Sequence, residues 1–192
     1  MGYQKYIRNL WKQPKQNLGD LWKQRLMQFR GEKGTIRIEH ATRIDRAHAL
    51  GFRAKPGFLI VRQRVARSKR MRPGPLGGRR PKHSRRRMVV SKNYQQIAEV
   101  RAADHFPNCE VLGSYWVAED GKYAWYEIIF VDPQHPAIQA DPKIRWIAEK
   151  QHTGRVYRGL TSASRKSRGL RRRGIGAEKV RPSSRSHHRR VH

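Results

Sequence analysis

Apolar side chains recur at helical spacing in the first thirty residues of the chain. Pro14 separates two such series, because proline does not continue a helix, and Gly31 provides a stop after the second. The two series are Tyr3, Tyr6, Ile7, Leu10 and Trp11, and then Leu18, Leu21, Trp22, Leu26 and Phe29. Two helices are therefore predicted, each with its apolar stripe packed against the body of the protein. The basic residues between the apolar positions are then available to face a partner: Lys5, Arg8, Lys12, Lys23 and Arg25.

The next part of the sequence reads as a short helix followed by a strand. The helix is predicted over 44–50, and residues 58–67 (FLIVRQRVAR) then alternate in the manner of a strand. The two predicted faces of this strand are Leu59, Val61 and Val65 on one side, and Phe58, Ile60, Arg62 and Arg64 on the other. Such a strand requires partners in a sheet.

The second half of the sequence predicts a helix, a hairpin and a further short helix. Ser91 is a suitable N-cap for the helix. Two strands, 111–118 and 123–131, flank Asp120-Gly121, a strong signal for a two-residue hairpin turn. Asp141, followed by proline, marks the start of the short helix. Because strands and helices do not alternate regularly, the predicted fold class is α+β, with a small, mainly antiparallel sheet and packed helices.

Charge is distributed unevenly along the chain. Lysine and arginine total 44 against 14 acids, which gives a formal net charge of +30. Residues 68–87 hold 9 basic side chains and no acid, and 150–192 hold 14 against one glutamate, whereas 88–149 hold 5 against 9 acids. The predicted organisation is N-terminal helices and a first strand in 1–67, a basic extended loop in 68–87, a helix–hairpin–helix part of the α+β body in 88–149, and a basic C-terminal extension in 150–192.

The two basic segments are expected to repel themselves and to need a polyanion to order them. From His152 onward periodicity vanishes, so this part is predicted to be a tail, and a chain cut after Gln151 is predicted to keep a folded body. Arginine suits bidentate contacts to phosphate, whereas surfaces that serve solubility alone mix both signs of charge. Nucleic acid is therefore the predicted partner. The predicted contacts are Lys69, Arg70, Arg72, Arg79, Arg80, Lys82, Arg85, Arg86, Arg87, Arg158, Arg165, Lys166, Arg168, Arg171, Arg172 and Arg173.

Candidates for catalysis, metal binding or cofactor binding are few. Glu119 and Asp120 are adjacent carboxylates at a hairpin tip, where exposed acids are ordinary, whereas an acid/base pair needs two different environments. A proline between His105 and Cys109 breaks any shared helix face, and the histidines lack partners at ligand spacing. Gly121-Lys122 lacks the upstream glycine of a phosphate-binding loop. The sequence thus predicts no enzymatic activity, no metal, no cofactor and no small-molecule substrate.

The cysteine content and the N-terminal sequence bear on the compartment. Cys109 is the single cysteine, which fits a reducing interior. The N-terminus lacks the apolar run of a signal peptide, and no stretch is long enough to span a bilayer. We therefore expect an intracellular protein with no membrane partner.

The kind of nucleic acid is indicated by what the sequence lacks. No helix-turn-helix, zinc finger or basic zipper is present, and neither is the aromatic signature of an RNA recognition motif. Long arginine-rich segments that fold on binding suit a structured RNA. An architectural DNA or chromatin protein is the alternative, because minor-groove proteins also combine arginines with apolar side chains. An RNA-modifying enzyme is a third possibility, for which the sequence offers no cofactor loop or acid/base pair.

The run from Arg158 to Leu170 (RGLTSASRKSRGL) resembles the signature of the archaeal and eukaryotic large-subunit ribosomal proteins called the fifteen-e family. Ser164 departs from it, since glycine is expected there. Other blocks resemble the same family in the same order, nearly from end to end. They are residues 3–11, 43–47, 50–57, 114–120 and 131–136, with an ending over 176–182 that is similar to archaeal members.

The resemblance implies a structural component of the large ribosomal subunit in the cytoplasm. It implies a small α+β body whose extensions are buried in ribosomal RNA, contacts with neighbouring ribosomal proteins, and no enzymatic activity. The residues alone predict nucleic-acid binding, and the resemblance adds the ribosome.

Overall fold

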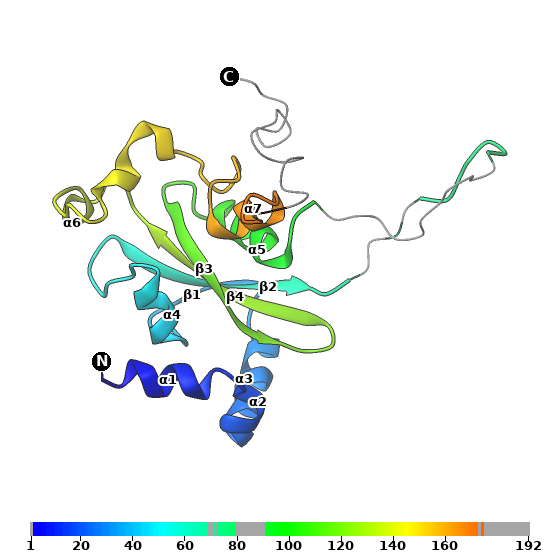
Figure 1. Cartoon of the computed structure of the whole chain (residues 1–192), viewed down its shortest axis with the longest axis horizontal. Coiled ribbons are helices and arrows are strands. Elements are labelled where there is room, and N and C mark those ends of the chain that lie inside the picture. Colours follow the sequence, from blue (N-terminus) through cyan, green and yellow to red (C-terminus); the bar gives the residue numbers. More distant parts are fainter. Residues whose placement is uncertain (1, 69–70, 72, 80–90, 173, 175–192) are drawn as a thin grey trace.

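The computed structural model describes residues 2–68, 71, 73–79, 91–172 and 174. A four-stranded antiparallel sheet lies at the centre of the molecule, with the strand order β1-β2-β4-β3 (Figure 1). The strands are β1 (Thr35–Ile38), β2 (Phe58–Ala66), β3 (Glu110–Glu119) and β4 (Tyr123–Val131). Every strand pair in this sheet is antiparallel and helices pack on it, so the predicted α+β class is confirmed.

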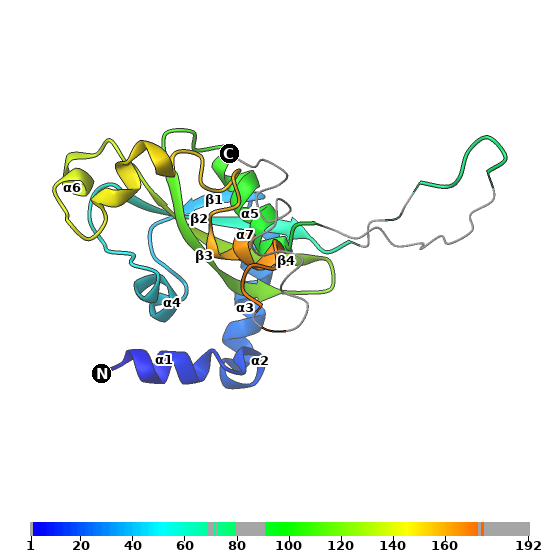
Figure 2. The same ribbon diagram turned by 45° about the horizontal axis from the view of Figure 1, so that its top comes forward.

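Helices cover both faces of the sheet (Figures 1 and 2). On one face, α5 (Tyr94–Ala103) packs through Ala98 and Ala102. On the other face, α3 (Gly19–Gly31) packs through Trp22 and Phe29. Because both faces are covered, β4 is buried along nearly its whole length, and its successive apolar side chains alternate between the two clusters.

The predicted faces of β2 are confirmed. Val61 and Val65 belong to the cluster under α5. Arg62 points the other way, and its guanidinium lies 4.0 Å from the ring centroid of Phe29 in α3. The alternation read from the sequence therefore sets which side chains meet each helix.

The predicted N-terminal helices form, but they bury less of their stripes than expected. They are α1 (Gln4–Leu10) and α3, with the short α2 (Pro14–Asn17) between them. Trp11 is buried, whereas Tyr6 keeps 71% of its surface exposed and Leu10 keeps 43%. The predicted packing holds for Ile7 and Trp11 but was wrong for Tyr6 and Leu10, because α1 lies at the edge of the molecule, beside α4 (Ile44–Ala49) and away from the sheet (Figure 1).

Two local predictions need correction in the second half of the fold. The N-cap of α5 is Asn93 and not Ser91, since the Asn93 side chain accepts a hydrogen bond of 2.7 Å from the N–H of Gln96. The β3–β4 hairpin is confirmed, but three residues connect its strands. The Asp120 carboxylate shapes this turn by accepting from the N–H groups of Lys122 at 2.8 Å and Tyr123 at 2.6 Å.

The sequence pattern missed β1. This edge strand pairs along β2, from Thr35 opposite Gln63 to Ile38 opposite Ile60. The Thr35 hydroxyl donates to the Gln63 side-chain oxygen at 2.5 Å. Its two isoleucines alternate, but the pattern spans only four residues and is too short to indicate a strand from the sequence. The strand is stabilised mainly by its pairing with β2.

The helix predicted after Asp141 forms as a single 3₁₀ turn, η1 (Arg145–Ala148), between α6 (Pro136–Gln139) and η2 (Lys150–His152). This segment closes one end of the sheet through a small cluster that includes Ile138, Ile144 and Ile147. Gly57 packs against it with a φ of +87°, and a Cβ at Gly57 would lie 2.5 Å from Cγ1 of Ile138. The turn before β2 therefore needs glycine both for its backbone and for its space.

The prediction of a tail from His152 onward was wrong for residues 153–172. Val156, Thr161, Ala163 and Ser164 are buried, and residues 162–167 form α7 (Ser162–Ser167) beside α5 (Figure 1). Because these side chains complete the core, a chain cut after Gln151 would not keep an intact body. Residues 80–90 and 175–192 lie outside the described residues, so the division of the chain there remains a prediction.

A buried carboxylate, Glu99 of α5, fastens this segment to the sheet. Glu99 is fully buried, and Thr161 donates to its Oε2 at 2.6 Å. Ser114 of β3 donates to its Oε1. Thr161 also caps α7, because its hydroxyl accepts from the N–H of Ser164. Ser164, which departs from the family pattern, fits here because its hydroxyl lies 2.9 Å from that of Thr161 and donates to it, since the single Thr161 proton is committed to Glu99.

Glu99 is expected to make stability depend on pH. Burial raises the pKa of the Glu99 carboxyl above its ordinary value of 4.5, against the opposing hydrogen bonds from Ser114 and Thr161. Above pH 4.5 the native state therefore holds this proton longer than the unfolded chain does, so the contribution of Glu99 to stability falls as the pH rises through that window. Urea unfolding should show that Glu99→Gln, relative to wild type, gains stability as the pH increases.

The control for this measurement is Glu149→Gln, because Glu149 is an exposed carboxylate outside the core. Its stability relative to wild type is expected to vary little over the same pH range. A stability difference between Glu99→Gln and wild type that stays constant with pH would contradict the prediction.

A second buried polar cluster lies on the opposite face of the sheet, under α3. Arg62 and Tyr115 are the cross-strand neighbours of Glu127 on the two sides of β4. Glu127 is fully buried, and its carboxylate accepts from Tyr115 at 2.7 Å and from Arg62 at 3.2 Å. The other end of the Arg62 fork donates to both carboxylate oxygens of Glu32, at 2.7 and 2.8 Å. This cluster ties the end of α3 to three strands.

Candidate nucleic-acid interface

The predicted basic loop leaves the body at the end of β2. Its described residues 73–79 lie far out from the sheet, beyond the end of that strand (Figures 1 and 2). Arg79 is exposed there. Because this segment projects from the folded body, the charge of Arg79 is accessible to a partner. The other predicted contacts of this loop lie outside the described residues: Lys69, Arg70, Arg72, Arg80, Lys82, Arg85, Arg86 and Arg87.

The second part of the predicted interface is α7 and the turn that follows it. Arg165, Lys166, Arg171 and Arg172 are all exposed. Arg171 also donates to the Ser162 hydroxyl at 2.5 Å, which holds the turn against the start of the helix. The helix therefore fixes a group of cations on the surface, where the sequence suggested a loose tail. Arg173 lies outside the described residues.

Arg158 and Arg168, like Arg171, take part in internal hydrogen bonds. The Arg158 guanidinium is exposed but donates to the carbonyl of Thr153 at 2.8 and 3.0 Å and to that of Gln151. Arg168 is half-buried and donates to the carbonyl of Gly159 at 3.1 Å. Burial, followed by the nearby charge of Arg165, lowers the pKa of Arg168 from its ordinary value. Arg158 and Arg168 therefore stabilise the backbone next to the exposed cations of α7.

Helix α1 adds a basic face. Lys5, Arg8 and Lys12 recur at helical spacing and are exposed, beside the inward-facing Ile7 and Trp11. The nearby Arg25 does not join them, because it is half-buried with its guanidinium 5.6 Å from the Trp11 ring centroid. Its burial lowers the pKa of Arg25. The exposure of Lys5, Arg8 and Lys12 fits the expectation that these cations are available to a partner, whereas Arg25 packs into the fold.

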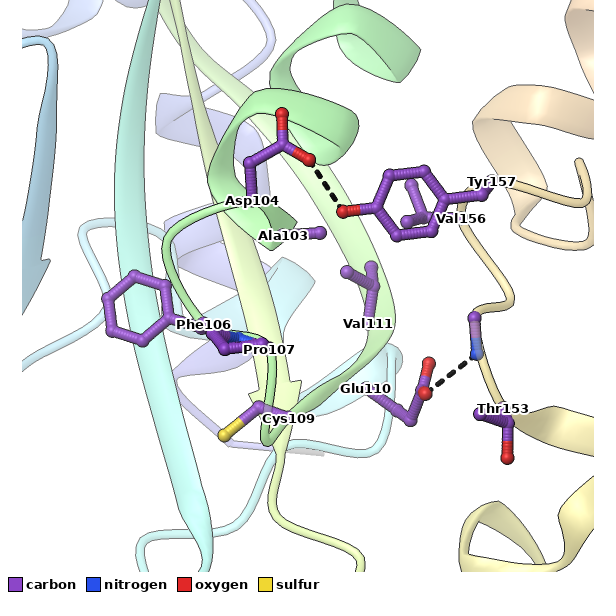
Figure 3. A pocket seen from close by; sticks show the side chains of 11 residues that line it. Ala103, Asp104, Phe106, Pro107, Cys109, Glu110, Val111, Thr153, Val156 and Tyr157 are labelled. Carbon is purple, nitrogen blue, oxygen red and sulfur yellow. Dashed lines mark hydrogen bonds between the residues drawn. The ribbon is translucent and has the colours of Figure 1, made fainter.

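A hollow of about 340 Å³ lies where residues 153–157 meet the end of α5 and the start of β3 (Figure 3). Tyr157 donates to Asp104 at 2.6 Å, and this hydrogen bond raises the pKa of Tyr157 to about 12. Burial raises the pKa of the Cys109 thiol. Both groups therefore stay protonated at neutral pH, and neither is an activated nucleophile. The hollow marks the contact between residues 153–157 and the rest of the fold. Glu110 helps to hold this segment in place by accepting a hydrogen bond from the N–H of Gly154 at 2.7 Å.

Two further properties concern the described part of the chain. It contains no group of three or more His, Cys, Asp or Glu side chains placed to hold a metal ion. Among its helices, none is long and apolar enough to cross a membrane.

Comparison with known proteins defines the class of this protein. The family model described as "Ribosomal L15" matches residues 2–187, which is nearly the whole chain. The chain belongs to this family of ribosomal proteins, and the resemblance seen in its sequence blocks is confirmed.

Two curated archaeal relatives carry the same name, "Large ribosomal subunit protein eL15". The protein of Nanoarchaeum equitans (strain Kin4-M) is 53% identical over 186 residues, which cover 97% of this chain and 98% of the relative. The protein of Methanocella arvoryzae (strain DSM 22066 / NBRC 105507 / MRE50) is 48% identical over 187 residues, which cover 96% and 95%.

Proposed function

We propose that the protein is a structural constituent of the large ribosomal subunit in the cytoplasm, where it binds and stabilises folded ribosomal RNA and contacts neighbouring ribosomal proteins. The family match supports this proposal, since both relatives are named as large-subunit proteins. The observation that carries the RNA contact is the exposure of Arg79 on the projecting loop and of Arg165, Lys166, Arg171 and Arg172 at α7, outside a body segment that is slightly acidic.

The proposed mechanism is electrostatic docking of two basic surfaces. The loop surface extends from β2, and the α7 surface consists of Arg165, Lys166, Arg171 and Arg172. Binding to phosphates releases counterions from the RNA, which supplies most of the affinity without requiring a base sequence. The folded body positions the two surfaces relative to each other. The remaining predicted basic contacts are part of the same proposal.

We also propose that the protein has no catalytic activity, cofactor or small-molecule substrate. Asp120 at the β3–β4 turn supports this proposal, because its carboxylate is committed to Arg30, whose Nε donates to it at 2.8 Å, and to the backbone N–H groups of the turn. The raised pKa values of Cys109 and Tyr157 also support the absence of catalysis, because both groups stay protonated and are not activated nucleophiles. RNA binding therefore rests on shape and charge.

A competition experiment tests the choice of nucleic acid. The full-length protein is bound to a labelled fragment of folded large-subunit ribosomal RNA and challenged with unlabelled fragment or with duplex DNA of equal phosphate content. We expect the RNA to compete at least tenfold more effectively, which corresponds to about 1.4 kcal/mol. Equal competition by duplex DNA would contradict the proposal and favour an architectural DNA-binding protein.

A further inference from the structure

Three tryptophans from separate segments meet at the junction of the N-terminal helices and β3. Trp22 of α3 stacks on Trp116 of β3, with ring centroids 6.0 Å apart and an interplanar angle of 27°. Trp11 packs edge-on to both rings, at 6.3 Å from Trp22 and 6.5 Å from Trp116. A register shift of β3 against β4 falls between Trp116 and Ala118, and irregularities of this kind re-aim side chains.

A cavity of about 320 Å³ opens beside this aromatic group. Trp22 and Trp116 form its apolar wall, and α2 and the end of β3 form its rim. Trp116 is partly exposed, so its ring is available to a flat ligand. The volume lies at the lower end of the range for small-molecule and cofactor pockets.

Four polar side chains surround the cavity: Gln13, Lys15, Gln16 and Glu119. All four are exposed. None of them makes a side-chain hydrogen bond or an ion pair with another described residue, unlike the neighbouring Asp120, which is held by Arg30. The rim therefore offers amide donors and acceptors, one cation and one carboxylate that the described fold does not use.

We propose that this cavity binds an unpaired nucleobase of the RNA, with guanine preferred. The inference rests on the proposed RNA-binding function and assigns a base-binding site to a part of the surface outside the loop and α7. An aromatic wall stacks on any base. Lys15 at the rim provides positive charge for a flanking phosphate.

Glu119 sets the preference for guanine. A carboxylate accepts hydrogen bonds and cannot donate them when ionised. The pairing edge of guanine carries two adjacent N–H donors, whereas uracil flanks its single N–H with two carbonyl oxygens that a carboxylate repels. A carboxylate at the rim also disfavours a phosphate in the cavity itself, so the base and not the backbone occupies it.

The test uses the full-length protein and two labelled RNA heptamers of equal charge, UUUGUUU and UUUUUUU. Because both carry the same phosphates, the electrostatic contribution cancels when their affinities are compared at one salt concentration. We expect the guanine-containing heptamer to bind about five- to tenfold more tightly and to quench the tryptophan fluorescence more strongly.

Two variants locate the effect. Glu119→Gln is expected to reduce the preference for guanine to within about twofold, because the neutral amide can also donate to uracil. Trp116→Leu is expected to remove both the preference and the quenching. Glu149→Gln is the matched control, since it removes one exposed carboxylate from another part of the surface and should leave the preference intact. If Trp116→Leu does not fold, as judged by circular dichroism, Glu119→Gln still decides the question.

The outcomes separate this inference from the proposed function. Equal affinities for the two heptamers, or a preference that survives Glu119→Gln, would overturn the base site while leaving RNA binding in place. If the cavity instead holds an apolar side chain of a neighbouring protein, the two heptamers should bind equally and neither should quench the tryptophan fluorescence more than the other. Failure to bind either heptamer at low salt would contradict both the base site and the proposed function.

Discussion

The affinity of the protein for its RNA is expected to fall by roughly 10³–10⁵ between about 50 and 200 mM salt, on the scale established for about six to ten phosphate contacts to duplex DNA. The net charge of +30, the exposed Arg79 of the loop and the exposed cations of α7 and α1 motivate this expectation. The physical cause is counterion release, because each phosphate that a lysine or arginine neutralises frees condensed cations from the RNA. Fluorescence anisotropy titrations at a series of salt concentrations measure the slope.

A double variant assigns part of that slope to α7. Arg165→Ser with Lys166→Ser removes two exposed cations and is expected to reduce the salt slope by about two, one for each lost phosphate contact. The control is Lys143→Ser with Arg145→Ser, which removes the same charge near the carboxylates of Asp141 and Glu149. A flat salt profile for the wild-type protein would contradict the electrostatic mechanism, and equal slopes for both variants would contradict the role of α7.

Arg62→Ala is expected to destabilise the protein by about 3–5 kcal/mol, because it leaves the fully buried carboxylate of Glu127 without its cation. It also removes the bidentate contact to Glu32 and the guanidinium over the Phe29 ring. Tyr115 and Thr42 still donate to Glu127, at 2.7 and 2.5 Å, so the fold is weakened and not abolished. Urea unfolding monitored by tryptophan fluorescence measures the change.

The matched comparison for Arg62→Ala replaces both partners. Arg62→Met with Glu127→Met removes the charges together and fills similar volume, so it is expected to destabilise the protein much less than Arg62→Ala alone. If Arg62→Ala lowers the free energy of unfolding by less than about 1 kcal/mol, the Arg62–Glu127 pair behaves like a solvent-screened surface ion pair. That result would contradict its stabilising role in the core.

Local patterns in the sequence predicted the elements, whereas long-range pairings decided how they are completed. The alternation in residues 58–67 placed Arg62 on the correct face of β2, but its partner Glu127 follows from strand register, which the pattern does not contain. β1 was missed because its pairing with β2 carries more of its stability than its own four residues do. The packed segment after His152 was missed for the same reason, since Thr161 is anchored by Glu99, 62 residues away.

The candidate interface divides in the same way. Composition predicted which residues supply charge, and the structure shows that Arg165, Lys166, Arg171 and Arg172 are exposed on α7 and the turn after it, while Arg168 is half-buried. Composition could not predict the tryptophan-walled cavity, because its lining comes from α2, α3 and β3. The sequence thus predicts which residues carry charge, whereas tertiary packing decides which of them are exposed together on one surface.

The central claim, that the protein is a constituent of the large ribosomal subunit, is tested most directly by its sedimentation. Ribosomes from the native source are separated into subunits on a density gradient, and the protein is followed before and after a high-salt wash. We predict that it remains with the large subunit in both cases, because many RNA contacts and packed protein surfaces hold an assembled component in place. Its recovery at the top of the gradient or with chromatin, even at low salt, would contradict the account.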